Sequence, residues 1–107
     1  MANDFKNGLA KDVGSSAVTL YTTPSLKQSI IIECDVCNTT SATITTDVFI
    51  ASGGQDFHIV KNAPVPTGGT LQVVSNQKII LESGEVLKVK SSAASSADVI
   101  ASILEDV

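Results

Sequence analysis

Apolar and polar residues alternate along most of this chain, and the alternation predicts strands. Successive side chains of a strand point to opposite faces, so a period of two indicates a strand with one buried face. In the segment 43–51, Ile44, Thr46, Val48 and Ile50 fall on one face and Thr45, Asp47 and Phe49 on the other. In Ser29–Asn38 the same rule places Ile30, Ile32, Cys34 and Val36 together.

Eight short strands are predicted in all, separated by turn residues. They span 17–23, 29–38, 43–51, 57–60, 70–74, 78–82, 86–90 and 98–104. Short strands at this spacing are typical of an antiparallel sandwich, so we expect an all-β fold, a single antiparallel β-sandwich of Ig-like or jelly-roll-like type. A helix over Ser95–Leu104 is the main alternative, because the apolar residues there also fit a helical period.

The stretch Phe57–Gly69 is where we expect the chain to pass from one sheet to the other. It begins as a strand and then meets Pro64 and Pro66, which fix φ and remove two backbone donors. Gly68 and Gly69 follow and supply the positive-φ freedom of a tight reversal. The pattern predicts a strand, an extended crossing and a turn into the second sheet.

The first fourteen residues are the least regular segment. We interpret residues 1–14 as an N-terminal arm and residues 15–107 as the sandwich domain. Phe5, Leu9 and Val13 are isolated apolar anchors in a polar context, and Phe5 and Leu9 could share a face of one short helix. An arm of this length cannot bury itself, so we expect these three side chains to form an interface with its own domain or a neighbouring subunit.

The composition of the chain argues against some classes of binding partner. The 107 residues suffice for one domain with a modest, largely aliphatic core, since aromatic residues make up only 4%. A net charge of -4, with lysine as the only basic residue type besides one histidine, argues against nucleic acid. No apolar run approaches the ~18–20 residues of a membrane span, and the first residues lack the pattern of a signal peptide. We expect a protein made in a reducing cytoplasm that binds neither nucleic acid nor membrane.

Two candidate reactive groups have simpler structural interpretations. Cys34 and Cys37 form a C-x-x-C, but within a strand positions i and i+3 point to opposite faces, and a zinc site needs a second ligand pair. We expect two unpaired structural thiols. His58 is the only histidine and has no G-x-S-x-G nucleophile elbow to work with, so we interpret it as a sheet-surface or interface residue.

Glu33 and Asp35 are the remaining candidates. They share one strand face about 7 Å apart by strand rise, a spacing that could suit a glycosidase or a cation. Solvated strand faces produce the same pattern routinely, and a chain without Trp lacks the usual sugar platform. We therefore expect no catalytic, cofactor-binding or metal-binding residues and no small-molecule substrate, and an enzyme is the least favoured class.

Five segments carry a recognisable pattern. They are Met-Ala-Asn-Asp-Phe-Lys-Asn (1–7), Val-Gly-Ser-Ser-Ala-Val-Thr-Leu-Tyr-Thr-Thr-Pro (13–24), Ile-Val-Lys-Asn-Ala-Pro-Val-Pro (59–66), Gly-Thr-Leu-Gln-Val-Val (69–74) with Gln-Lys-Ile-Ile-Leu-Glu-Ser-Gly-Glu (77–85), and Val-Lys-Ser-Ser-Ala-Ala-Ser-Ser-Ala-Asp-Val-Ile-Ala-Ser-Ile-Leu-Glu (89–105). In these segments, which are spread from residue 1 to residue 105, the protein resembles small virion proteins of tailed bacteriophages, including marine phages and cyanophages. The turn Pro-Ser-Leu-Lys at 24–27 departs from the Pro-Ala-Gly-Lys type more usual there.

The resemblance implies a virion structural protein. Our first expectation is a capsid decoration (cement) protein that stabilises the head lattice as a symmetric homo-oligomer, with the major capsid protein as partner and assembly in the host bacterial cytoplasm. The alternative is a neck, tail, baseplate or fibre-attachment component. A third possibility, from another class, is a lectin-like module that binds a carbohydrate or cation through Glu33 and Asp35.

Overall fold

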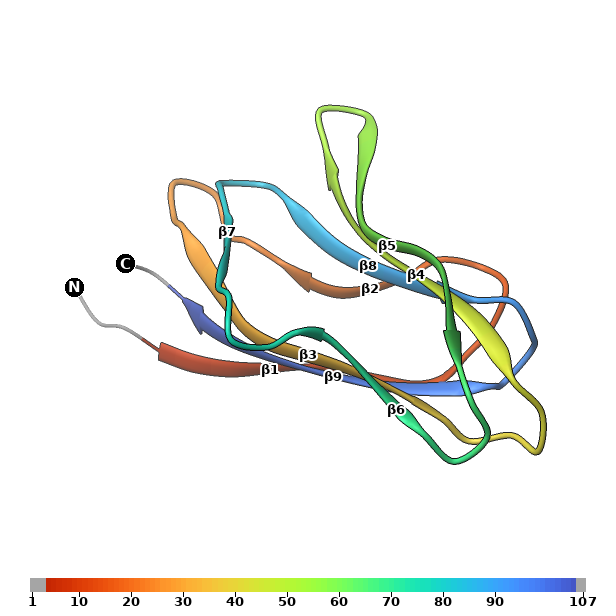
Figure 1. Ribbon diagram of the computed structural model, residues 1–107. Coiled ribbons are helices and arrows are strands. Elements are labelled where there is room, and N and C mark those ends of the chain that lie inside the picture. Colours follow the sequence, from red (N-terminus) through yellow and green to blue (C-terminus); the bar gives the residue numbers. More distant parts are fainter. Residues whose placement is uncertain (1–3, 106–107) are drawn as a thin grey trace.

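The computed structural model describes residues 4–105, which form nine β-strands in two antiparallel sheets packed face to face (Figure 1). This confirms the predicted all-β antiparallel sandwich. The described residues contain no helix, and therefore none that could cross a membrane. The helix considered for Ser95–Leu104 is a strand, whose side chains alternate between buried and partly exposed.

The two sheets divide the strands unequally. The first sheet has the order β1 (Asp4–Val13), β9 (Ala97–Glu105), β3 (Ser29–Asn38) and β6 (Thr70–Val74), and β7 (Ile79–Leu81) shares the far edge of β3 with β6. The second sheet has the order β2 (Val18–Thr22), β8 (Val86–Ser91), β4 (Ile44–Ser52) and β5 (Gln55–Val65). The strands β1, β5 and β2 are therefore edges, and β9 is central.

The core is an aliphatic layer between the sheets. Its most buried side chains, each at most 1% exposed, include Ile31, Val36, Leu81, Val99 and Ile103 from the first sheet and Val48, Leu87 and Val89 from the second. Burying an aliphatic side chain of this size contributes about 1.5–3 kcal/mol. Because the strands alternate, each buried row leaves an outward row on the opposite face, and the candidate surfaces are built from those outward rows.

The structure corrects the face predicted for the first residues of β3. Ile31 is fully buried, whereas Ile30 and Ile32 are partly exposed. The register with β9 shifts between Ile31 and Glu33, so an extra residue in β3 exchanges the two faces at that point. Cys34 lies in the core as predicted, but a strict period of two carried back through the bulge assigns Ile30 and Ile32 to the wrong face.

The connection from β5 to β6 joins the two sheets. Pro64 ends the edge strand β5, where a missing N–H costs little, and residues 66–69 lead into β6 of the other sheet (Figure 1). Gly68 has φ 69°, as a tight reversal requires. Gly69 does not lie in the left-handed region, contrary to the sequence expectation. It is needed for space, since a Cβ there would lie 3.0 Å from the Pro66 ring.

The predicted arm is an edge strand of the sandwich. Residues Asp4–Val13 form β1, which pairs with β9 from Asp4 opposite Glu105 to Ala10 opposite Val99, and the short helix is wrong. Apolar residues four apart fit one face of a helix and one face of a strand equally, which explains the error. A register shift after Ala10 then turns Val13 into the core, where it is 1% exposed. Residues 1–3 of the predicted arm lie outside the described residues.

Candidate functional site

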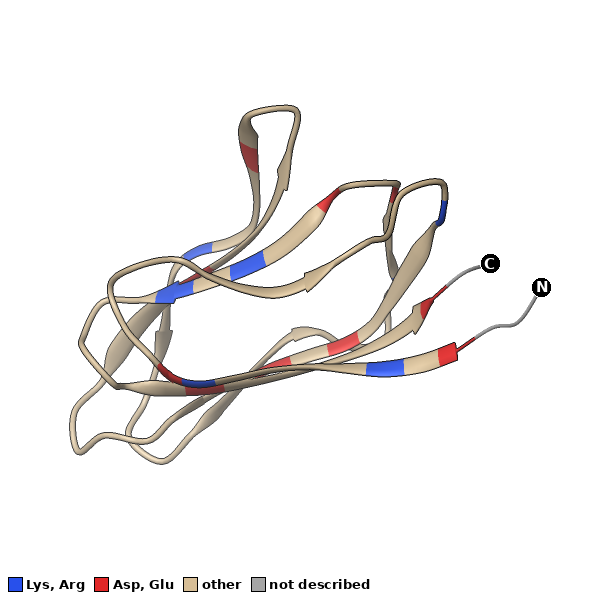
Figure 2. Cartoon of the chain, turned by 180° about the vertical axis from the view of Figure 1, so that it is seen from behind, with Lys and Arg blue, Asp and Glu red and all other residues tan. Residues whose placement is uncertain are grey.

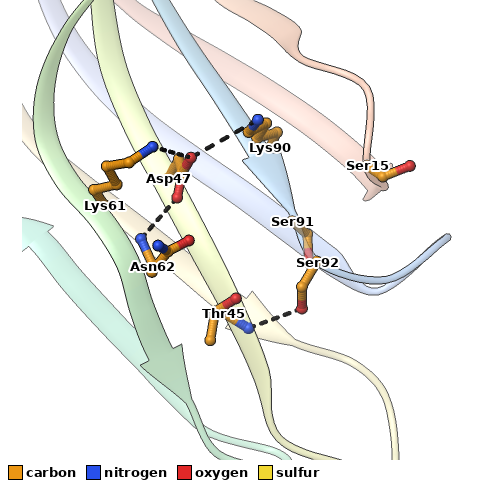
Figure 3. Close-up of a pocket in the computed structure, with 8 residues that line it drawn as sticks. All are labelled: Ser15, Thr45, Asp47, Lys61, Asn62, Lys90, Ser91 and Ser92. Carbon is orange, nitrogen blue, oxygen red and sulfur yellow. Dashed lines mark hydrogen bonds and ion pairs between the residues drawn. The ribbon is translucent and has the colours of Figure 1, made fainter.

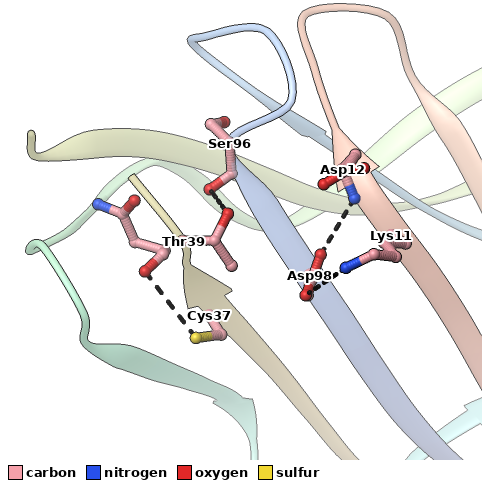
Figure 4. A network of polar contacts seen from close by, with 7 residues as sticks. Lys11, Asp12, Cys37, Thr39, Ser96 and Asp98 are labelled. Atoms are coloured by element: carbon pink, nitrogen blue, oxygen red, sulfur yellow. Dashed lines mark hydrogen bonds and ion pairs between the residues drawn. The ribbon is translucent and has the colours of Figure 1, made fainter. Parts of the chain in front are cut away.

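The two cysteines lie on opposite faces of β3, as their spacing predicts. Both are free thiols. Cys34 is fully buried, and its burial raises the pKa of the thiol to about 12, which makes it a poor nucleophile. Cys37 is on the outer face, where its Sγ lies 3.9 Å from the carbonyl oxygen of Asn38 (Figure 4).

Glu33 and Asp35 come together on the outer face of β3. Burial of Asp35, a hydrogen bond with Glu33 and the charge of Glu33 raise the pKa of the Asp35 carboxyl to about 6. The Oδ1 atom of Asp35 is buried without a hydrogen-bond partner. Within residues 4–105 no group of three or more His, Cys, Asp and Glu side chains is placed to hold a metal ion. The Asp35 carboxyl therefore holds its proton more tightly than an ordinary aspartate does.

His58 belongs to a cluster around a buried carboxylate that the sequence analysis missed. Asp47, on β4, is 4% exposed. Its Oδ2 atom lies 3.9 Å from the Nε2 of His58 and 3.9 Å from each Nζ of Lys61 and Lys90. The backbone N–H of Asn62 donates a 2.7 Å hydrogen bond to Oδ1 (Figure 3).

The local backbone explains how this carboxylate is held. The register between β4 and β5 shifts on both sides of Val48, and Asn62 takes a positive φ of 53°. These irregularities aim the Asn62 N–H at Asp47. A shallow depression of about 280 Å³ is lined by Asp47 and its partners Lys61, Asn62 and Lys90. Its rim includes Thr45, Ser91 and Ser92 (Figure 3).

Two hydroxyl groups of this depression, those of Ser91 and Ser92, are bonded within the fold. Ser91 and Ser96 share a hydrogen bond, and the Ser92 Oγ accepts one from the Thr45 N–H. The imidazole of His58 lies against the ring of Phe49 at 5.0 Å between centroids. Such an arrangement covers an outward Phe and neutralises a carboxylate, which is a structural task.

The outer face of the first sheet is different, because its apolar side chains have no cover. Four of the seven exposed large hydrophobic side chains in residues 4–105 lie on its strands: Phe5 (78% exposed), Leu9 (65%), Ile80 (62%) and Ile100 (54%). Leu9 is directly opposite Ile100 across β1 and β9. Directly opposed residues of neighbouring strands share a face, so these two side chains form one patch.

A second row crosses four strands of the same sheet. Phe5 is opposite Leu104, Leu104 is opposite Ile30, and Ile30 is opposite Ile80. We call the outward side chains of these two rows the apolar face; it consists of Phe5, Leu9, Ile30, Ile80, Ile100 and Leu104. Contiguous exposed apolar surface on a small protein marks a site of association.

Charge is also divided between the sheets (Figure 2). Strands of the first sheet carry six acidic residues and two lysines, namely Asp4, Asp12, Glu33, Asp35, Asp98, Glu105, Lys6 and Lys11. Strands of the second sheet carry three lysines and two acidic residues, namely Lys61, Lys88, Lys90, Asp47 and Asp56. The apolar face thus lies on an acidic sheet, which suits a partner with basic residues around an apolar centre.

The far end of β1 is fixed by polar contacts. Asp98, on β9, accepts a 3.0 Å hydrogen bond from the backbone N–H of Asp12 and lies 3.6 Å from the Nζ of Lys11 (Figure 4). These contacts pin the register shift that sends Val13 inward. Of the three predicted arm anchors, the structure leaves Phe5 and Leu9 on the surface and packs Val13 into the core of its own domain.

Sequence comparisons add no family to this picture. The chain matches no protein-family model, and it matches no curated protein sequence.

Proposed function

We propose that this protein is a structural component of a tailed-bacteriophage virion, most specifically a capsid decoration protein, and that it acts by protein–protein contact without a catalytic step. The observation that carries the proposal is the apolar face, with Phe5, Leu9 and Ile100 all more than half exposed. The resemblance of segments spread along the chain to small virion proteins supplies the context.

The energetics support a partner on this face. Covering a Phe, Leu or Ile side chain removes apolar area from water, and full burial is worth about 1.5–3 kcal/mol per side chain. The side chains stand on β1, β9 and β3, which are continuously paired, so little ordering is needed when a partner binds. A rigid sheet with an uncovered apolar row is suited to lying on a lattice.

Binding to particles tests the proposal directly. Purified capsids that lack the protein are mixed with wild-type protein, Leu9→Asp or the matched control Leu26→Asp, and pelleted. Leu26 is 96% exposed in the turn between β2 and β3, away from the apolar face. We expect Leu9→Asp to lose at least tenfold in capsid affinity and Leu26→Asp to bind as the wild type does. Equal binding of all three proteins would contradict a role for this face.

Copy number separates decoration from the alternative. Quantitative mass spectrometry of virions gives the ratio of this protein to the major capsid protein. A ratio near one, or a simple fraction such as one third, supports decoration of the lattice. A ratio of roughly one to fifty, which matches the single rings of a neck or tail, would replace decoration by a neck, tail, baseplate or fibre-attachment role.

A further inference from the structure

The edges of the two sheets are not equally protected against pairing. The edge strand β5 carries Pro64 and two register shifts, and β2 has five residues with a register shift after Thr19. The far edge of β3 is divided between β6 and β7, of five and three residues. Proline, bulges and short length are the devices by which natural sheets block edge-to-edge association.

Strand β1 lacks part of this protection. Charged side chains also protect edges, and β1 carries Lys6 and Lys11, but each of these lysines lies against a carboxylate of β9, and the one register shift of β1 comes after Ala10. The strand is ten residues long, has no proline, and runs in unbroken register from Asp4 to Ala10. One side of its backbone pairs with β9, and the other side faces outward from the end of the sheet order. Gly8 faces inward, where a Cβ would lie 2.8 Å from the Leu20 carbonyl oxygen of β2, so β1 contacts the second sheet through its inner face.

We propose that a second copy of this chain pairs with β1 along this edge, antiparallel and about a twofold axis at Asn7. In such a pair, the residue number in one copy and the number of the residue opposite it in the other copy always add up to the same value, which defines the register. The sum 14 places Phe5 opposite the partner's Leu9, Leu9 opposite the partner's Phe5, and Asn7 opposite the partner's Asn7. A slip by one residue would oppose outward to inward side chains.

Registers shifted by two residues also keep outward side chains opposite outward side chains, but they form fewer apolar pairs. The sum 12 opposes Phe5 to Asn7, and the sum 16 opposes Phe5 to Lys11 and Leu9 to Asn7. Among the three, only the sum 14 forms two apolar cross-strand pairs, each worth roughly 0.2–1 kcal/mol beyond its burial. It also continues the apolar face of one copy into that of the next, since Leu9 already adjoins Ile100 within each chain.

Charge does not oppose this pairing. Lys6 lies 3.4 Å from Glu105 of its own chain, and the pKa of Glu105 is held below its ordinary value by a hydrogen bond from the Tyr21 hydroxyl and by the charge of Lys6. Lys11 is paired with Asp98. In the proposed register Lys6 is opposite Gly8 and Asp4 is opposite Ala10, so no like charges are directly opposed.

Mass in solution tests the dimer on the full chain without any virion. Sedimentation equilibrium should give twice the 11.1 kDa chain mass for the wild type and for Leu26→Lys, and should show at least tenfold weaker association for Leu9→Lys. The Leu9→Lys change places a charge on the edge, as protected edges do. A monomeric wild type, or a Leu9→Lys protein that associates as tightly as the wild type, would overturn the inference.

A crosslink tests the register. In a Cys37→Ser background, which removes the accessible native thiol, Asn7→Cys should be joined efficiently into dimers by a short bis-maleimide, while Gln72→Cys on the opposite edge should not. A dimer linked through residue 72 and not through residue 7 would overturn the proposed pairing. A wild type that is monomeric in solution yet still binds capsids would overturn the dimer and leave the proposed function standing.

Discussion

The outer faces of the two sheets differ in whether their outward side chains are covered or paired within the chain. On the second sheet, Phe49 is covered by His58, and Asp47 is surrounded by three basic side chains and a backbone N–H. On the first sheet, Phe5, Leu9 and Ile100 are exposed, and Asp35 has a buried oxygen with no partner. On one face these groups are covered or paired by the chain itself, and on the other they are left exposed or without a partner.

The difference shows where to look for function in a small sandwich. In the depression beside Asp47, the carboxylate accepts a hydrogen bond from Asn62, Ser91 bonds with Ser96, and Ser92 accepts a hydrogen bond from the Thr45 N–H. The face of β1 and β9 has a depression of similar size, about 250 Å³, beside Phe5 and Asn7, and it also holds the uncovered apolar side chains. Uncovered apolar surface therefore distinguishes the two faces, and the size of a hollow does not.

The largest effect should come from removing the carboxylate on the outer face of the second sheet. Asp47→Ala leaves the Asn62 N–H without its acceptor and removes the carboxylate that Lys61 and Lys90 face, so we expect the free energy of unfolding to fall by about 2–3 kcal/mol. Urea denaturation of the variant and the wild type measures this change in the free energy of unfolding. The matched control Lys61→Gln removes an exposed partner and should cost less than about 0.5 kcal/mol. Equal losses would show that the carboxylate is not the centre of the cluster.

The strand β1 allows the same comparison within ten residues. Val13→Ala should lower the free energy of unfolding by about 2 kcal/mol, because it removes two methyl groups from a fully buried position and leaves a cavity. Leu9→Ala, at a site 65% exposed, should change it by less than about 0.5 kcal/mol. Both are measured at two protein concentrations, because association adds a concentration-dependent term. A Leu9→Ala loss as large as that of Val13→Ala at low concentration would contradict this division.

The smallest effect concerns pH. The pKa of Asp35 is raised to about 6 in the folded chain, so the folded state binds the proton more tightly than the unfolded state does. The carboxylate therefore destabilises the fold above about pH 6, and the penalty is relieved as pH falls toward the ordinary Asp value. We expect Asp35→Asn to gain at most about 1 kcal/mol at pH 8, after allowance for solvent screening, and little at pH 4. Glu82→Gln, at an exposed position, is the control, and a gain independent of pH would contradict the raised pKa of Asp35.

The sequence was informative where the alternation is regular. In the segment 43–51, Ile44, Thr46 and Val48 are buried as the period of two predicts, although Ile50 is partly exposed and Asp47 and Phe49 on the opposite face are buried as well. The method failed at bulges, because a single extra residue in β3 reverses the faces and leaves no mark in the order of residues. It failed again at β1, where the four-residue spacing of Phe5, Leu9 and Val13 does not separate a strand from a helix.

The candidate surfaces were less predictable than the fold. Phe5 and Leu9 could be identified because they are apolar residues in a polar segment. Ile80 and Ile100 could not, since each lies in a run of apolar residues and only the pairing shows which side chains face outward. Asp47 escaped notice because its partners Asn62 and Lys90 come from β5 and β8, and nothing local signals that they meet.

The position of β9 has a consequence for how the protein is made. This strand follows the other eight in chain order, yet it lies between β1 and β3 and pairs with both, joining residues as distant as Asp4 and Glu105. During synthesis β1 therefore has no strand to pair with until β9, which follows the other eight strands, has left the ribosome. Pairing of such long range is slow, on the order of milliseconds to seconds. A nascent chain stopped before β9 cannot complete its first sheet, so the apolar face across β1, β9 and β3 forms only after β9 has been translated.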